Sequence, residues 1–296
     1  MHVAVSVLLC AVVVTGAAPS NSGHPAPTTV AVPGGVIAYD VTGMGHTVVL
    51  LHGGALDRRM WDDQVPALAV RYRVIRVDSR GHGRSSDVAG PYSNVDDLYA
   101  VLKATRTEHA VLVGLSLGGR TVLDFALAHP EMTDAVVAVS PGMSGYEFTD
   151  PLLAESNAAI AKAARTGDVD AVVELLQRSW TDGPKRAPGQ VPPEVRERVR
   201  VMLHDTLTTM RGRGEVRELG AASRLRQIRC PVLAVLGDLD MADIHTIVDR
   251  IGREVPRARV VVVRGAAHML NMEKPEELNR ILLDFLAAVD RPRLHR

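Results

Sequence analysis

A serine between two glycines has the clearest chemistry in this chain. Residues 111–119 read Val-Leu-Val-Gly-Leu-Ser-Leu-Gly-Gly, so an apolar run ends in glycine and a helical pattern follows Ser116 at once. A strand, a sharp turn and a helix in this order lift the serine hydroxyl above the strand end, where a substrate can reach it. We call this turn the elbow. Gly114 and Gly118 then stand where the two backbones lie too close for a β-carbon. The pattern predicts a serine nucleophile, although so short a motif also arises by chance and its context must decide.

A serine hydroxyl is a weak nucleophile unless a histidine takes its proton and a carboxylate holds that histidine in the right tautomer. We call these three groups the triad. Two late loops offer these groups. An apolar run that ends at Leu236 leads into Gly-Asp-Leu-Asp, which contains Asp238 and Asp240. A second run, which ends at Val263, leads through Arg-Gly-Ala-Ala to His268. Both loops follow strand-like segments, so we expect their side chains at one rim of a sheet together with the serine.

Composition narrows the possible partners. The 296 residues include 34 lysines and arginines against 34 aspartates and glutamates, with no basic stripe that alternates with aromatic residues. Neither nucleic acid nor an anionic membrane surface is therefore an expected partner, and a small molecule fits better. Only two cysteines occur, Cys10 and Cys230, so no disulfide framework is expected.

The first 27 residues resemble a secretory signal peptide followed by a flexible segment. Residues 3–14 are nearly all apolar, and Gly16 and Ala18 suit cleavage after Ala18. The apolar run is too short to cross a bilayer as an ordinary helix, so no stable membrane insertion of the mature chain is expected. Only His2 and the terminal amine supply positive charge before it. The alternative is a disordered extension or a miscalled start, which would leave the protein cytoplasmic rather than exported.

Strand-like and helix-like segments alternate over most of the remaining chain, which predicts an α/β protein with a mostly parallel sheet covered by helices on both faces. Strands are expected at residues 29–32, 36–41, 47–51, 72–77, 110–113, 135–139, 231–236 and 259–263. Helices are expected at residues 61–69, 96–105, 117–129, 244–251 and 275–289.

The pattern changes in the middle of the chain. Residues 143–225 contain no strand-like run, whereas residues 152–165, 169–179 and 194–209 are helix-like and charged. We therefore expect a core formed by residues 28–142 and 226–296, with residues 143–225 inserted as a helical lid.

Several short motifs occur in a fixed order. They are His52-Gly53-Gly54, Asp78-Ser-Arg-Gly-His-Gly-Arg-Ser85, Gly114-Leu-Ser116-Leu-Gly118, Gly237-Asp-Leu-Asp240 and Gly265-Ala-Ala-His268. With these motifs the chain, over about residues 30–290, resembles the α/β-hydrolase superfamily, and within it the lid-bearing esterase, lactonase and cofactor-free peroxidase branch. The resemblance implies an α/β-hydrolase fold that acts without a cofactor.

The same resemblance implies a role for individual residues. Ser116 is the expected nucleophile, His268 the base and Asp240 the acid, while the amides of Gly54 and Leu117 form the expected oxyanion hole. The acid has rivals, because Asp238 is two residues away and Asp243 follows closely, although Asp243 could instead cap a helix that begins at Ile244.

The aspartates of this segment, Asp238, Asp240 and Asp243, together with His245, could also be taken for a metal site. The run lacks a recognised ligand spacing, so no metal is expected.

Other notable residues have structural explanations. His52 is expected to shape the oxyanion loop, and His82 and Arg84 to stabilise their own turn. Five further side chains could line a pocket under the lid, but they serve equally well as plain packing. They are Met143, Tyr146, Phe148, Trp180 and Met202.

These residues favour a hydrolase that cleaves a carboxylic ester or lactone by two-step acyl transfer. A serine at the elbow argues against haloalkane dehalogenases and epoxide hydrolases, which use aspartate there. A carbon–carbon bond hydrolase and a cofactor-free haloperoxidase would keep the same triad. A non-catalytic ligand-binding member of the fold is the alternative of a different class.

Overall fold

The fold is organised around one eight-stranded sheet. A computed structural model describes residues 28–88, 90–187, 189–210, 212 and 214–290, so the expected signal peptide lies outside the described residues. The strands are β1 (Thr28–Val32), β2 (Gly35–Thr42), β3 (His46–Leu51), β4 (Tyr72–Val77), β5 (Ala110–Leu115), β6 (Thr133–Val139), β7 (Val232–Gly237) and β8 (Ala258–Val263). Their order is β1-β2-β4-β3-β5-β6-β7-β8. The pairs β1–β2 and β2–β4 are antiparallel, and the remaining neighbours, from β4 through β3 and β5 to β8, pair parallel.

Helices cover both faces of this sheet, as parallel strands require. Successive residues of β5 face opposite ways, so Val111 and Val113 join one hydrophobic core and Leu112 joins the other. The first core includes side chains of α1 (Val65–Leu68), α8 (Leu270–Glu273) and α9 (Pro275–Asp290). The second includes side chains of α2 (Asn94–Ala104), α3 (Leu117–Ala128) and α7 (Ala242–Glu254). The predicted fold class is confirmed.

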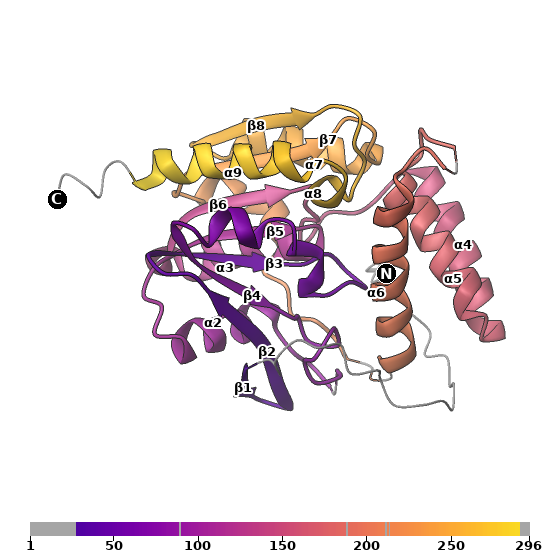
Figure 1. The fold of residues 1–296 in the computed structure, drawn as a ribbon, viewed down its shortest axis with the longest axis horizontal. Helices are drawn as coiled ribbons and strands as arrows, with labels where there is room; N and C mark the ends of the chain where they lie inside the picture. Colours follow the sequence, from indigo (N-terminus) through magenta and orange to yellow (C-terminus); the bar gives the residue numbers. More distant parts are fainter. Residues whose placement is uncertain (1–27, 89, 188, 211, 213, 291–296) are drawn as a thin grey trace.

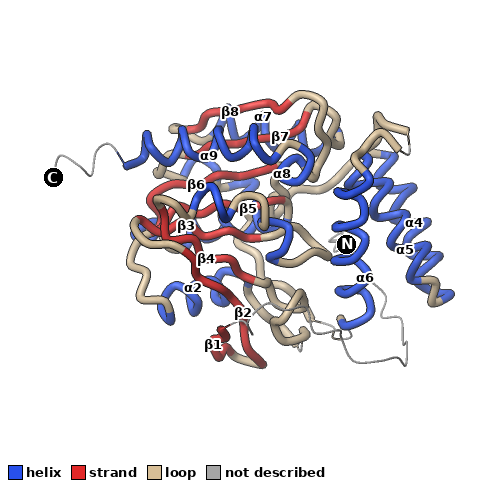
Figure 2. Tube along the Cα trace, viewed as in Figure 1, coloured by secondary structure: helices blue, strands red, loops and turns tan. Residues whose placement is uncertain are grey.

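Three further helices stand between β6 and β7 in the chain. They are α4 (Pro151–Thr166), α5 (Val169–Leu176) and α6 (Pro193–Thr209), and we call residues 151–209 the α4–α6 segment. Asp150 and Asp168 cap the first two helices, since each carboxylate accepts a hydrogen bond from an amide of the first turn. The segment stands at the end of the sheet toward which the parallel strands point (Figure 1). Figure 2 shows the same helices, in blue, set apart from the red strands.

Most predicted elements are present with ends shifted by a few residues, but three differ in kind. The helix expected at 61–69 is a 3₁₀ turn, η1 (Arg58–Trp61), followed by the single turn α1, which begins next to Pro66. The helix expected at 169–179 ends at Leu176 and continues as a π-helical turn, η3 (Gln177–Asp182). Helix α8 was not predicted, because four residues are too few to show a helical period.

Three short 3₁₀ turns complete the described elements: η2 (Pro130–Met132), η4 (Ala221–Ser223) and η5 (Leu225–Gln227). Within the described residues, no helix combines the length and the apolar character that a membrane span needs.

Candidate active site

Ser116 occupies the turn between β5 and α3 in a strained conformation. Its φ is 54° and its ψ is −108°, a backbone region that side-chain-bearing residues rarely adopt. The close approach of strand and helix explains the flanking glycines. A β-carbon on Gly114 would lie 2.2 Å from the carbonyl of Gly118, and one on Gly118 would lie 2.2 Å from the carbonyl oxygen of Leu51. The turn therefore holds the serine above the end of the strand, as the sequence predicts.

His268 and Asp240 meet in the loops that follow β8 and β7. The imidazole Nδ1 lies 2.9 Å from Asp240 Oδ2 and 3.1 Å from Oδ1, and both side chains are buried. A carboxylate only accepts hydrogen bonds, so Nδ1 is the donor and Nε2 is the basic nitrogen of the neutral ring. The ring of Trp180, in η3, packs on this imidazole with centroids 4.6 Å apart. The pair has the geometry of a general base and its orienting acid.

The two rival aspartates serve other contacts. Asp238 Oδ1 accepts the amide hydrogen of Gly265 at 2.7 Å. Asp243 accepts from the hydroxyl of Tyr146 at 2.8 Å, and from the amides of Thr149 and Asp150 at 2.9 and 2.8 Å. Asp243 thus ties the start of α7 to the chain that leads into α4.

The suggestion that Asp243 caps a helix starting at Ile244 was wrong. Helix α7 begins at Ala242, its cap residue is Met241, and Asp243 lies inside the first turn. Among residues 28–290, as far as the structure describes them, no three His, Cys, Asp or Glu side chains are arranged to hold a metal ion.

A cavity of about 440 Å³ opens over the serine and is lined by Ser116 and His268. The α4–α6 segment supplies one wall, through Leu153, Asn157, Leu176, Trp180, Thr181, Val199 and Leu203. Of the five side chains that could have lined a pocket, Trp180 and Phe148 do so. Met143 and Met202 are buried in the hydrophobic cores, and Tyr146 packs edge-on against Phe148 at 5.5 Å. The cavity is therefore largely apolar around the serine.

Two loops at the cavity carry the amides expected to form an oxyanion hole. Neighbouring amides in these loops already have acceptors. The amide of Gly53 donates to Met60 Sδ at 3.1 Å and that of Ala55 donates to His82 Nε2 at 3.1 Å. The amide of Gly118 donates to the carbonyl oxygen of His52 at 3.0 Å. Gly54 lies between the first two, and Leu117 is the first residue of α3, whose amide has no partner within its own helix. Both residues line the cavity, and a β-carbon on Gly54 would lie 3.9 Å from Cβ of Leu117.

Two neutral histidines brace the loop of residues 52–55. His52 Nε2 accepts from the amide of Ser79 at 2.9 Å, and its Nδ1 donates to the carbonyl of Gly53 at 2.7 Å. His82 accepts from the amide of Ala55 and donates from Nδ1 to the carbonyl of Arg80 at 2.9 Å. Burial lowers the pKa of His52, and it lowers the pKa of His82 to about 4. His52 thus has the expected structural role, and His82 holds this loop as well as its own turn.

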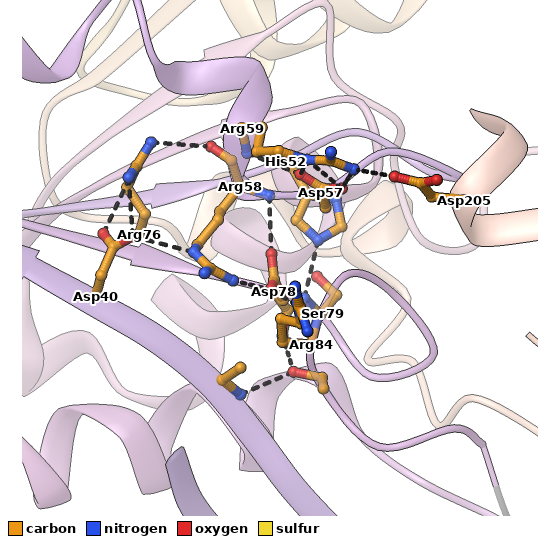
Figure 3. A network of polar contacts seen from close by, with 12 residues as sticks. Asp40, His52, Asp57, Arg58, Arg59, Arg76, Asp78, Ser79, Arg84 and Asp205 are labelled. Atoms are coloured by element: carbon orange, nitrogen blue, oxygen red, sulfur yellow. Dashed lines mark hydrogen bonds and ion pairs between the residues drawn. The ribbon is translucent and has the colours of Figure 1, made fainter. Parts of the chain in front are cut away.

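Arg84 contributes to that turn through its main chain. Its amide donates to Asp78 Oδ2 at 2.9 Å, whereas its side chain is exposed. Asp78 also accepts from the amide of Arg58 at 2.8 Å and pairs with the Arg58 guanidinium. Figure 3 shows these contacts beside His52. The buried carboxylate of Asp78 therefore links the turn of residues 78–85 to the loop that contains Arg58.

A second carboxylate in the same network connects the loop after β3 to the α4–α6 segment. Asp57 caps η1, and Arg59 bridges it to Asp205 of α6 at 2.6 and 2.8 Å (Figure 3). Although burial favours the neutral acid, the hydrogen bonds and charge of Arg59 lower the pKa of Asp57. The sequence does not predict this network, because its members pair across as many as 146 residues of the chain.

We expect the substitution His82→Gln to flatten the acid dependence of stability. The folded pKa of about 4 lies below the ordinary value of 6.5, so between these values the unfolded chain binds a proton that the folded chain excludes. The folded state therefore loses stability as the pH falls from 6.5 toward 4. Removing this group should reduce the slope of unfolding free energy against pH by up to about 1.4 kcal/mol per pH unit. Urea unfolding at several pH values measures this slope, and an unchanged slope would contradict the assignment.

Comparisons with known proteins agree with this architecture. A model of the alpha/beta hydrolase family matches residues 48–281. The chain is 27% identical to a pimeloyl-[acyl-carrier protein] methyl ester esterase from Aeromonas hydrophila, over 84% of this chain and 99% of that protein. It is 26% identical to a 2-hydroxy-6-oxo-6-phenylhexa-2,4-dienoate hydrolase from Comamonas testosteroni, over 85% of this chain and 91% of that protein. A hydrolase structure from Pseudomonas aeruginosa superposes with a TM-score of 0.71 at 27% identity, over 90% and 99% of the two chains.

The fold and these matches define an enzyme of the hydrolase class. The chain belongs to the alpha/beta hydrolase family, and the relatives named above are an esterase and other hydrolases.

Proposed function

We propose that this protein cleaves a carboxylic ester or lactone of a small molecule through an acyl-enzyme. In this proposal Ser116 is the nucleophile, His268 the general base and Asp240 the acid that orients it. The observation that carries the proposal is the hydrogen bond between His268 and Asp240 at the cavity onto which the strained Ser116 opens. Relatives named as esterases support the choice of substrate class.

The reaction follows from the roles of these groups. His268 Nε2 takes the hydroxyl proton as Ser116 Oγ attacks the carbonyl carbon, and the Asp240 carboxylate stabilises the imidazolium that forms. The amides of Gly54 and Leu117 bind the oxyanion, each donor being worth on the order of a hundredfold or more in rate. The imidazolium then gives its proton to the leaving alkoxide, which leaves the acyl group on Ser116. Water repeats the sequence and releases the acid.

In the same proposal, residues 143–225 act as a lid over a core made of residues 28–142 and 226–296. The α4–α6 segment forms one wall of the cavity, and its side chains there are mostly apolar. A wall of this kind sets which acyl or alcohol group fits beside the serine. The lid would therefore decide specificity, while the core supplies the chemistry.

A fluorophosphonate probe and a substrate panel test this proposal together. The probe should add its phosphonyl group to Ser116, where mass spectrometry of the tryptic peptide locates it. The purified protein should hydrolyse short p-nitrophenyl esters or lactones. Absence of both labelling and turnover would leave the non-catalytic, ligand-binding alternative.

The panel includes vinylogous diketones because one relative is named as a 2-hydroxy-6-oxo-6-phenylhexa-2,4-dienoate hydrolase. Turnover of the diketone alone would select carbon–carbon bond cleavage by the same residues. Assay of acetate with hydrogen peroxide covers the haloperoxidase alternative.

We further propose that residues 1–27 direct export. The apolar run and the small residues before Pro19 support this proposal. Expression of the full chain should yield an exported product whose N-terminus is Pro19. An uncleaved product retained in the cytoplasm would contradict export.

A further inference from the structure

Glu273 connects the loop that carries His268 to the α4–α6 segment. It is the last residue of α8, and its side chain is 2% exposed. One carboxylate oxygen, Oε1, accepts the amide hydrogen of Ala267 at 3.0 Å, directly before His268. The other oxygen pairs with the guanidinium of Arg186. A buried carboxylate with these two partners holds the histidine loop at a fixed distance from the α4–α6 segment.

Arg186 secures the other end of this connection. Its side chain is 8% exposed, its Nε donates to the carbonyl of Asp182 at 2.6 Å, and its Nη2 donates to the carbonyl of Thr181 at 2.8 Å. These carbonyls belong to the last residues of η3, where a helix leaves acceptors without partners in its own turns. The planar guanidinium thus joins the end of η3 to Glu273 with three donors.

The same short stretch also contacts the loop that carries Asp240. Lys185 Nζ donates to the carbonyl of Asp238 at 2.8 Å. A β-carbon on Gly183 would lie 2.8 Å from Cβ of Ala267 and 2.9 Å from the carbonyl oxygen of Leu239, so the backbone there packs against both loops. Residues 180–186 therefore contact the two loops that bring acid and base together.

Trp180, at the start of this stretch, packs directly on the imidazole. The ring centroids are 4.6 Å apart and the planes meet at 49°. Because Trp180 belongs to η3, any shift of η3 relative to α8 would move the surface against which His268 rests.

We propose that the buried Arg186–Glu273 ion pair is a positioning device that aligns the His268 imidazole through the histidine loop and η3. The inference rests on the proposed function, in which His268 is the base. Neither Arg186 nor Glu273 is among the residues that line the cavity, so the pair acts by fixing the loop and the aromatic surface on either side of the ring. A misplacement of about 1 Å in a reacting group can cost on the order of a hundredfold in rate.

The principal test is Glu273→Gln, which keeps an oxygen acceptor for Ala267 and removes the charge. We expect kcat for a p-nitrophenyl ester to fall by about ten- to a hundredfold, with KM changed by less than about threefold. The rate of phosphonylation of Ser116 should fall in parallel, because that step also needs His268 to take the proton. Arg186→Met should lower kcat at least as much, because it also removes the donors to the carbonyls of Asp182 and Thr181. The double variant should lose little more than Arg186→Met alone, since the ion pair is already broken in that variant.

Asp63→Asn is the matched control. Asp63 forms another ion pair between core and α4–α6 segment, with Arg198 of α6 at 2.7 Å, but it contacts neither triad loop. We expect this variant to keep kcat within about twofold of wild type. If Glu273→Gln does not fold, Arg186→Lys serves instead. Lysine retains the positive charge but lacks the planar guanidinium with its several N–H donors, so kcat should fall with little change in KM.

The outcomes separate the two proposals. Wild-type protein that neither hydrolyses esters nor accepts the probe would contradict the proposed function. Active wild-type protein with folded Glu273→Gln and Arg186→Met variants of unchanged kcat would overturn the positioning role alone. Equal losses in Asp63→Asn would also overturn it, because they would show a general effect of loosening the α4–α6 segment.

Discussion

Substitution of Ser116 by alanine is expected to lower kcat for a short p-nitrophenyl ester by roughly a millionfold. The acyl-enzyme cannot form without Oγ, so only binding and the oxyanion amides of Gly54 and Leu117 remain to accelerate attack by water. Alanine has the same β-carbon as serine, and the elbow strain at φ 54° is therefore retained. The fold should be preserved, as far-UV circular dichroism and the melting temperature can show.

Ser140 offers a matched control for this variant. It also has a positive φ, of 39°, follows the adjacent strand β6 and is fully buried. Its hydroxyl lacks a hydrogen-bond partner among the described residues, so Ser140→Ala should retain hydrolysis within about twofold. Substantial turnover by Ser116→Ala, measured in protein free of contaminating esterase and with the labelling site mapped, would contradict the assignment of the nucleophile.

The sequence predicted the sheet and the elbow well because both depend on local patterns. A parallel strand buried on both faces is a continuous apolar run, and β5 and β7 are buried along their whole lengths. The elbow is equally local, since the requirement for glycine at 114 and 118 arises from residues next to the turn and from one facing strand. Patterns of this range are visible in a single sequence.

The polar connections between distant segments were not predictable in the same way. Glu273 and Arg186 are 87 residues apart, and neither stands in a motif that distinguishes it from other charged residues near a helix end. The helix predicted at 169–179 includes only the first three residues of the π-helical turn, and Trp180 falls outside it. The η3 turn follows α5 without a proline or glycine at the junction, so the sequence gives no local sign of the change. Only the packed structure reveals that Trp180 contacts His268 and that Glu273, paired with Arg186, contacts the residue before it.

The acid illustrates the boundary between the two kinds of information. Three aspartates lie within six residues, and the spacing favours Asp240 without deciding between them. In the structure each carboxylate has a different hydrogen-bond donor. Asp238 accepts from the amide of Gly265, and Asp243 accepts from Tyr146 and from the chain before α4. Asp240 alone of the three accepts from His268. A triad is thus recognised by geometry, to which sequence spacing is a guide.

That geometry leads to a second large expected effect, for Asp240→Asn. The amide group of asparagine can donate to Nδ1 of His268, which would then place the ring proton on Nε2. An imidazole in this tautomer cannot take the proton of Ser116, so kcat should fall by about 10⁴-fold while the fold is kept. Ester hydrolysis and the rate of phosphonylation should fall together, because both require the same proton transfer.

The neighbouring aspartates supply the controls for this experiment. Asp238→Asn removes the charge from the same loop but not the contact with His268, and it should change kcat by less than about tenfold, as should Asp243→Asn. All three variants are compared over the same pH range, so that a shifted optimum is not mistaken for lost activity. Near-wild-type turnover of Asp240→Asn, or a larger loss in Asp238→Asn, would move the acid to the other aspartate. The expected ranking follows from the 2.9 Å contact between Asp240 Oδ2 and Nδ1, because His268 is the only imidazole among the described residues that lines the cavity and bonds to a carboxylate.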